Sequence, residues 1–209
     1  VEEIYQRVLD IAKGAALMSG TTHDIEFITG CYELLPNRTL SRLLLEKLQS
    51  LGEIHFTEEE QAFAKQLQST FLPSALRQSF ENLQNVVDVE LDPALLDKPL
   101  WGQILPHKEV SITLPGSTEV ADVSHITPTA QINTTCWPVG TPGHSWQIVA
   151  CSGSSIGFKG MQLAAKAIAL AGLDLFQRPD LLAEAQAEFK QRTNGKRYVS
   201  PLPENARPQ

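Results

Sequence analysis

The pattern GSSIG at 153–157 is the first group of residues whose types and spacing could do chemistry. It fits the G-x-S-x-G pattern around a serine hydrolase nucleophile, with Ser155 as the nucleophile, and an apolar run at 146–151 precedes it. In that fold the triad follows in the order serine, acid, histidine, whereas all five histidines here precede Ser155. The expected base is missing, so the glycines and serines are better explained as a loop and helix cap, whose N–H groups are either capped or bind an anion.

Two further candidates contain histidine. Glu119, Asp122 and His125 follow one another at steps of three, which would place them on one helical face, and zinc or manganese accepts such ligands. The alternative is that they solvate a helix or hold neighbouring backbone. His144 lies in a Pro142-Gly143 turn directly before a serine, near the expected end of a strand, where sites gather in α/β proteins. A lone histidine is also often a polar residue with structural partners, so both interpretations stay open.

Composition excludes several classes of function. The 209 residues carry a net charge of −7 without a basic cluster beyond the C-terminal helix, which argues against nucleic-acid binding. We find no membrane-spanning run and no leader, and three cysteines without paired spacing disfavour a disulfide framework or a zinc finger. We expect a cytoplasmic protein. The chain starts inside a helical pattern without an initiator methionine, so we expect a piece of a longer protein.

Hydrophobic periodicity and turn residues predict the elements that position these residues. The order begins as helix, strand and helix, and alternates strands and helices in its second part, which indicates an α/β class. Segment 73–110 has several prolines and is predicted to be irregular, and 200–209 to be an extended tail. Helices are predicted at 1–18, at 40–52 with Thr39 as N-cap and Gly52 as C-cap, from a Thr57–Glu60 capping box to 71, up to Ser124, from Ser154 or Ser155 to Ala171, and at 179–193, and strands at 21–35, 109–114 and 129–137.

Three segments together resemble a known family. GSTEVADVSHITPTAQINTTCWPVGTPGHSW, SSIGFKGMQLAAKAIALAG and YVSPLPENARP resemble the C-terminal part of the aminobenzoyl-glutamate utilization amidohydrolases. These are dinuclear metallopeptidases, related to aminoacylases, glutamate carboxypeptidases and auxin-conjugate hydrolases. The N-terminal IAKGAALMSGTTHDIEFITGCYELLPNRTLSRLLLEKL resembles the second half of the family's lid domain. The resemblance implies an α+β lid half at 1–54 and an α/β catalytic half at 55–209, both parts of a two-domain fold.

The resemblance also implies an activity and a set of site residues. Family members cleave N-acyl amino acids such as aminobenzoyl-glutamate with two zinc or manganese ions, which polarise the carbonyl and activate water. By position, His144 matches a ligand of the second metal, Asn37 an asparagine near the reacting carbonyl, and Gly116–Thr118 a loop near substrate. Family relatives pair through the lid, so the resemblance implies a homo- or hetero-dimer, with Thr22–Cys31 as candidate edge strand.

The family's other metal ligands and its general base have no match in this chain. We therefore expect no catalytic residue here, no tightly bound metal, and an inactive fragment of an active parent enzyme. Two alternatives remain: a stand-alone module that dimerises or binds a partner without catalysis, and the serine esterase using Ser155, which the order of histidines disfavours.

Overall fold

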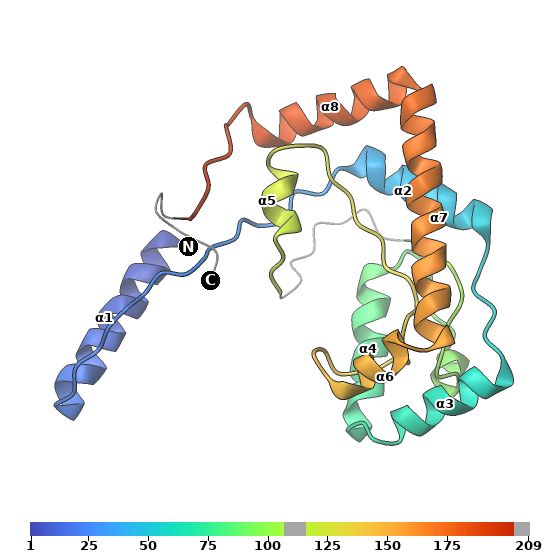
Figure 1. Ribbon diagram of the computed structural model, residues 1–209, viewed down its shortest axis with the longest axis horizontal. Coiled ribbons are helices and arrows are strands. Elements are labelled where there is room, and N and C mark those ends of the chain that lie inside the picture. Colours follow the sequence, from blue (N-terminus) through green and yellow to red (C-terminus); the bar gives the residue numbers. More distant parts are fainter. Residues whose placement is uncertain (107–115, 203–209) are drawn as a thin grey trace. The chain divides into compact units, whose positions relative to one another are not determined.

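The computed structural model describes residues 1–106 and 116–202, and these residues are largely helical (Figure 1). In chain order the helical elements are α1 (Glu2–Ser19), α2 (Arg38–Leu51), α3 (Glu58–Gln68), α4 (Pro73–Val86), η1 (Pro93–Asp97), α5 (Val120–Ser124), α6 (Trp146–Ser152), α7 (Ser155–Gln177) and α8 (Pro179–Thr193). The helices predicted from periodicity are confirmed, including the capping box of α3 and the C-cap at Gly52. The N-cap of α2 is Asn37, however, and Thr39 lies within the first turn.

The expected α/β class is wrong for the described residues, because they contain extended segments but no β-sheet. Segments 21–35 and 129–137 were predicted to be strands, and neither forms a strand in the structure. Isolated backbone hydrogen bonds occur instead, such as the one from Asn37 N to the Thr129 carbonyl at 2.8 Å. Alternation of side chains within one segment does not specify a pairing partner, and a ladder needs one. The strand predicted at 109–114 lies outside the described residues.

Two other sequence predictions need correction. Residues 73–110 are not wholly irregular, because they contain α4 and η1. Each of these helices has a proline, Pro73 or Pro93, in its first turn, where the missing N–H costs nothing, so proline starts the helix instead of ending one. The apolar run at 146–151 forms the helix α6 and not a strand, so His144 precedes a helix.

The chain divides into two compact units, one of Val1–Cys31 with the C-terminal residues from Val199, the other Tyr32–Tyr198. In the first unit, Tyr5 of α1 contacts Phe27 edge to face, with ring centroids 6.0 Å apart. The helix ends at Gly20, which adopts the left-handed conformation. Most of the apolar side chains of α1 are nevertheless exposed. The predicted domain boundary at 54/55 stays a prediction.

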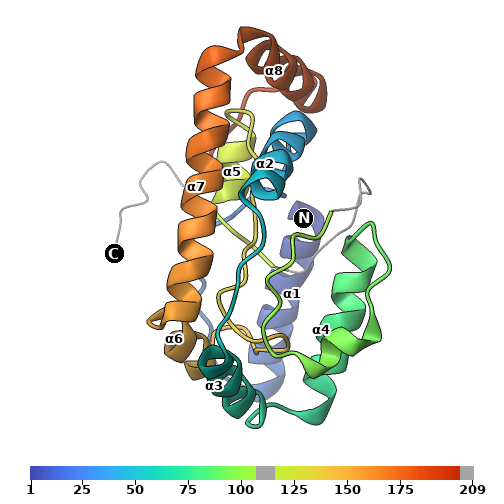
Figure 2. The same cartoon turned by 90° about the vertical axis from the view of Figure 1, so that its right-hand side faces the viewer.

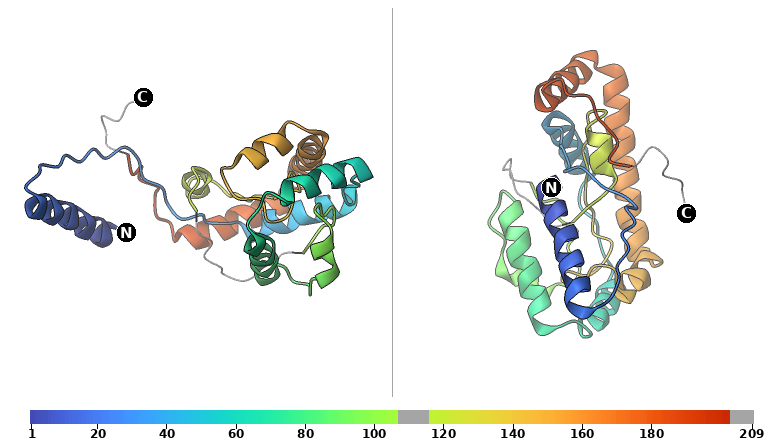
Figure 3. Two further views of the ribbon diagram at one scale, coloured as in Figure 1. Left: turned by 90° about the horizontal axis from the view of Figure 1, so that it is seen from below. Right: turned by 90° about the vertical axis from the view of Figure 1, so that its left-hand side faces the viewer.

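In the second unit, α7 is the longest helix, and the part of it nearer α8 packs against α2 (Figure 2). Buried Leu43 and Leu44 of α2 contact Ala171 of α7 and Leu181 of α8. The other end of α7 lies beside α3 and α6 (Figure 3). There, Ile156 of α7 belongs to a buried cluster with Cys151 of α6 and Ala64 of α3. Among the described residues α7 alone has the length and composition of a membrane-crossing helix. That is weak evidence for a span, because this helix contributes to both of these buried clusters.

Glu188 of α8 fixes the start of α2. Its carboxylate accepts hydrogen bonds from the backbone N–H groups of Arg38 and Thr39, at 2.8 and 3.0 Å, and from the Thr39 hydroxyl at 3.1 Å. Burial alone would raise the pKa of Glu188, but these hydrogen bonds and the charge of Arg192 lower it below its ordinary value. A carboxylate at this position also interacts favourably with the positive end of the α2 dipole. The contact therefore holds α8 across the turn that carries Asn37.

Candidate functional site

His144 lies in the turn immediately before α6, and its side chain is exposed. Its backbone has φ 53°, a left-handed conformation that an L-residue adopts at a cost of roughly 1–2 kcal/mol. We find no hydrogen bond between its ring and any described residue. Strained residues of this kind gather at functional sites, where the surrounding structure holds them in place. An exposed imidazole without a described hydrogen-bond partner could serve as one ligand of a metal ion.

The strain at His144 gives a stability prediction. We expect His144→Gly to be about 1 kcal/mol more stable than His144→Ala, because glycine adopts this backbone conformation without a steric cost and alanine does not. Both variants lose the imidazole, so the comparison isolates the backbone. Urea unfolding of the two variants measures the difference. Equal midpoints would show that the turn relaxes and does not store strain.

The structure gives Asn37 a helix-capping role. Asn37 is 2% exposed. Its Oδ1 accepts from Leu40 N at 3.0 Å, and its Nδ2 donates to the Ala185 carbonyl of α8 at 2.9 Å. These bonds leave one amide hydrogen and one lone pair of Oδ1 unused, but the side chain is buried, so this structure does not present it to a substrate. Sequence reasoning placed the N-cap two residues later and so did not assign this structural role.

The predicted loop at 116–118 leads into α5. Gly116 has φ 140°, a conformation that favours glycine, and nothing lies within 4 Å of the position its Cβ would take. Gly116 and Ser117 are exposed, while the Thr118 hydroxyl accepts from Val120 N at 3.3 Å. Within the described ranges, no hydrogen bond links this loop to Asn37 or His144. The structure therefore does not join the three predicted contacts into one site.

The alternative metal site at Asp122 and His125 has structural partners instead. Asp122 accepts a hydrogen bond from the Tyr198 hydroxyl at 3.0 Å, and His125 Nε2 lies 3.0 Å from the Glu33 carbonyl. The His125 ring also stacks with Tyr32, with centroids 4.7 Å apart. In the part of the chain that the structure describes, no three histidine, cysteine or acidic side chains gather closely enough to hold a metal. His125 thus contacts neighbouring backbone, and Asp122 contacts a neighbouring side chain.

Ser155 belongs to a partly buried polar cluster around Glu60 that sequence reasoning missed. Its hydroxyl donates to Glu60 Oε1 at 2.6 Å, and Lys159 Nζ lies 2.6 Å from Glu60 Oε2, which also accepts from Thr57 N at 2.7 Å. Burial raises the pKa of Glu60, but the hydrogen bonds from Lys159, Ser155 and Thr57 outweigh it and lower the pKa to about 2. A carboxylate of such low basicity does not activate a serine at neutral pH. The sequence offered two signals for this cluster. Glu60 occupies a capping-box position, and Ser155 and Lys159 are four residues apart, which places them on one face of a helix.

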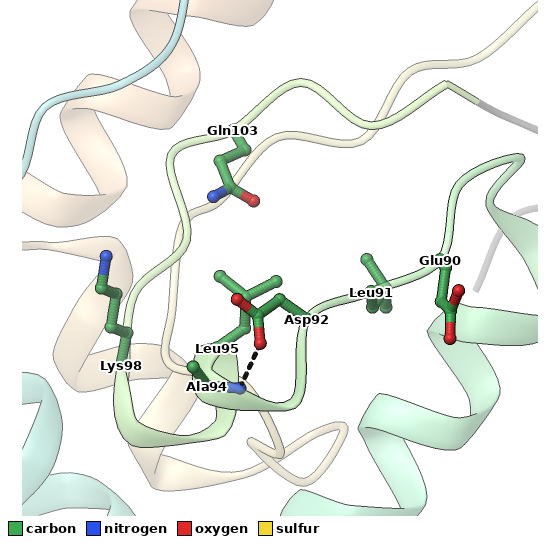
Figure 4. A pocket seen from close by; sticks show the side chains of 7 residues that line it. All are labelled: Glu90, Leu91, Asp92, Ala94, Leu95, Lys98 and Gln103. Carbon is green, nitrogen blue, oxygen red and sulfur yellow. Dashed lines mark hydrogen bonds between the residues drawn. The ribbon is translucent and has the colours of Figure 1, made fainter.

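Two hollows lie beside η1 and the segment 53–56. One has a volume of about 280 Å³ and is open beside η1, where Glu90, Asp92 and Lys98 contribute charged groups (Figure 4). Asp92 already caps η1 by accepting from Ala94 N at 2.9 Å. The other, of about 170 Å³, adjoins it near Gly102. Neither is lined by a predicted site residue.

Comparison with known proteins supports the motif analysis. The chain is similar to a subunit of p-aminobenzoyl-glutamate hydrolase from Escherichia coli (strain K12), with 38% identity over the whole of this chain. The match lies in the C-terminal part of that protein, and the chain spans 44% of its length. No family model and no solved structure matches the chain. The resemblance to the aminobenzoyl-glutamate amidohydrolases is thereby confirmed.

Proposed function

We propose that this chain is the C-terminal part of an amidohydrolase of the aminobenzoyl-glutamate type, to which it contributes a metal-ligating histidine, His144. The observation that carries the proposal is the 38% identity to a hydrolase subunit over the whole chain. The strained and solvent-exposed backbone position of His144, in the segment that shares the family's motif, supports its role.

The reaction is hydrolysis of an N-acyl amino acid, with aminobenzoyl-glutamate as the substrate that the relative's name indicates. Two zinc or manganese ions, when bound, would polarise the amide carbonyl and lower the pKa of a water molecule. His144 supplies one imidazole nitrogen to them. Gly116–Thr118 approach the substrate from an exposed loop, whereas Asn37, which is buried here, would contact it only after the turn before α2 opens. The remaining ligands and the base come from residues outside this chain's described part.

The parent enzyme also assembles into a dimer through the unit that contains α1, and a cytoplasmic location fits this proposal. The apolar side chains of α1 support it, since Ile4, Val8 and Ile11 are 66%, 53% and 70% exposed. These residues recur at steps of three and four, so they form one face, and a uniformly exposed apolar face of this kind marks an interaction surface. Homo- and hetero-dimers are both compatible with this surface.

The test is an assay of aminobenzoyl-glutamate hydrolysis, in which the amount of aminobenzoate released is measured. The chain alone should be inactive, whereas the chain joined to a polypeptide equivalent to the rest of the relative should hydrolyse the substrate when zinc or manganese is added. In the joined protein we expect His144→Ala to lower kcat/KM at least about tenfold, because a lost ligand weakens metal binding.

His55→Ala is the matched control, because His55 is also exposed and we expect its removal to change kcat/KM less than about twofold. Unchanged activity in His144→Ala would remove His144 from the metal site. Turnover by the chain alone would contradict the need for ligands from elsewhere.

A further inference from the structure

We propose that Gln68, Thr70 and Gln147 are positioning residues for His144, which hold both ends of the segment that carries its imidazole. This inference deepens the proposed function, because it concerns the same histidine. The segment is 139–147, and we call it the histidine loop. Two of its hydrogen bonds join it to Gln68, the last residue of α3, and to Thr70 just after α3, 71 and 77 positions earlier in the chain.

The entrance of the histidine loop is held at Val139. Gln68 Nε2 donates to the Val139 carbonyl at 2.9 Å, and Val139 N donates to the Pro99 carbonyl at the same distance. Pro138, directly before it, is among the most deeply buried side chains in the described part of the chain. Both backbone groups of Val139 are therefore used, so the loop starts from a fixed point.

The exit of the loop is held at Gln147, in the first turn of α6. Its side chain is buried, and Nε2 donates to the Thr70 hydroxyl at 3.1 Å. The Thr70 hydroxyl in turn donates to the Leu67 carbonyl of α3 at 2.7 Å. Because Thr70 uses its one hydrogen toward α3, its oxygen must act as the acceptor for Gln147. The hydrogen bond from Thr70 to α3 therefore makes Gln147 the donor in its contact with Thr70.

Between these points the loop follows α4 closely. Gly140 has φ 85°, and a Cβ at this position would lie 3.0 Å from the Leu76 Cα. The loop can therefore approach the first turn of α4 only with glycine here. The two ends are thus tied and one flank is in contact, which limits the paths that the backbone can take through Pro142–His144. A left-handed histidine persists only where its surroundings determine the backbone in this way.

Hydrogen exchange of the chain itself tests the positioning role without any metal. In Gln68→Met and Gln147→Met, we expect the amides of the histidine loop to exchange about fivefold faster, because each change removes one hydrogen bond to the loop. Thr70→Val is a milder variant that removes the acceptor but keeps the shape of the side chain. It should produce a similar increase even if the glutamine variants fold poorly.

Gln61→Met is the matched control. Gln61 lies on the same helix as Gln68 and makes two comparable hydrogen bonds, to the carbonyl and the N–H of Leu100, at 3.1 and 3.2 Å, and among the described residues it has no hydrogen bond to the loop. Its substitution should leave exchange in the loop within about twofold of the wild type. Equal acceleration by Gln61→Met would overturn the inference, because the effect would then be general destabilisation.

A second readout is the zinc or manganese concentration that half-saturates activity in the joined amidohydrolase. We expect Gln68→Met to raise it about fivefold with little change in the activity at saturating metal, whereas Gln61→Met leaves it unchanged. If His144→Ala abolishes activity but Gln68→Met leaves this concentration unchanged, the positioning role is wrong and the proposed function stands. If His144→Ala has no effect, the proposed function itself fails.

Discussion

Replacing Gly102 with alanine should lower the free energy of unfolding by about 3 kcal/mol, because the added carbon has no space. A Cβ on Gly102 would lie 1.7 Å from the carbonyl oxygen of Ile54 and 2.7 Å from its carbonyl carbon. Both atoms belong to backbone, so no flexible side chain can move aside. The two segments are also joined by the hydrogen bond from Ile54 N to the Gly102 carbonyl at 2.9 Å. Separation of the backbones would break this bond and disturb Leu100 and Trp101, which are 2% and 5% exposed.

Urea unfolding at neutral pH measures the loss, and Gly172→Ala is the control. Gly172 lies within α7, and nothing lies within 4 Å of the position of its Cβ. Alanine there should stabilise the protein by roughly 0.5–1 kcal/mol, because it has the higher helix propensity. The two substitutions are therefore expected to have opposite signs. A Gly102→Ala variant as stable as the wild type would show that the segments at 54 and 102 separate without cost.

Local signals predicted the helices well because helix hydrogen bonds form within one segment. The Thr57–Glu60 capping box and the glycine at position 52 marked boundaries that the structure confirms. Proline was harder to interpret, because Pro73 either ends one helix or begins the next, and only its position in the fold decides. The strand predictions had a different weakness. Alternation in 129–137 indicates an extended segment, but a sheet also needs neighbours that the segment does not encode.

The candidate site also combines features that a local sequence signal indicates with features that depend on distant residues. The Pro-Gly turn drew attention to His144, and the structure adds its left-handed backbone, which no residue type encodes reliably. The contacts that hold it join residues far apart in sequence, as in Gln68 with Val139. Ser155 attracted attention through a local motif, yet its hydrogen-bond acceptor is Glu60, 95 positions earlier. Nothing in the order of the chain brings these pairs together before the fold is known.

Loss of the Glu60 carboxylate is the other change from which we expect a large effect. Glu60 is 8% exposed and accepts hydrogen bonds from Lys159, Ser155 and Thr57. Glu60→Ala should reduce the free energy of unfolding by about 3 kcal/mol, because Lys159 keeps its charge in a half-buried place without its partner. In the double variant Glu60→Leu with Lys159→Met, an apolar pair replaces the ion pair, so we expect much of the stability to return. A double variant no more stable than Glu60→Ala would contradict the assignment of the loss to an unpaired charge.

The pH dependence follows from the same contacts. Because the folded-state pKa of Glu60 is about 2 and its ordinary value is 4.5, the carboxylate contributes stability that is fully present above about pH 4.5. This contribution, about 3 kcal/mol for such a difference, is lost as the pH falls from 4.5 through 2. Glu60→Gln cannot be protonated in this range, so its unfolding free energy should fall less between pH 5 and pH 2 than that of the wild type. Glu59→Gln, at an exposed neighbouring carboxylate, should retain the wild-type dependence. Parallel curves for Glu60→Gln and the wild type would show that other carboxylates cause the acid sensitivity.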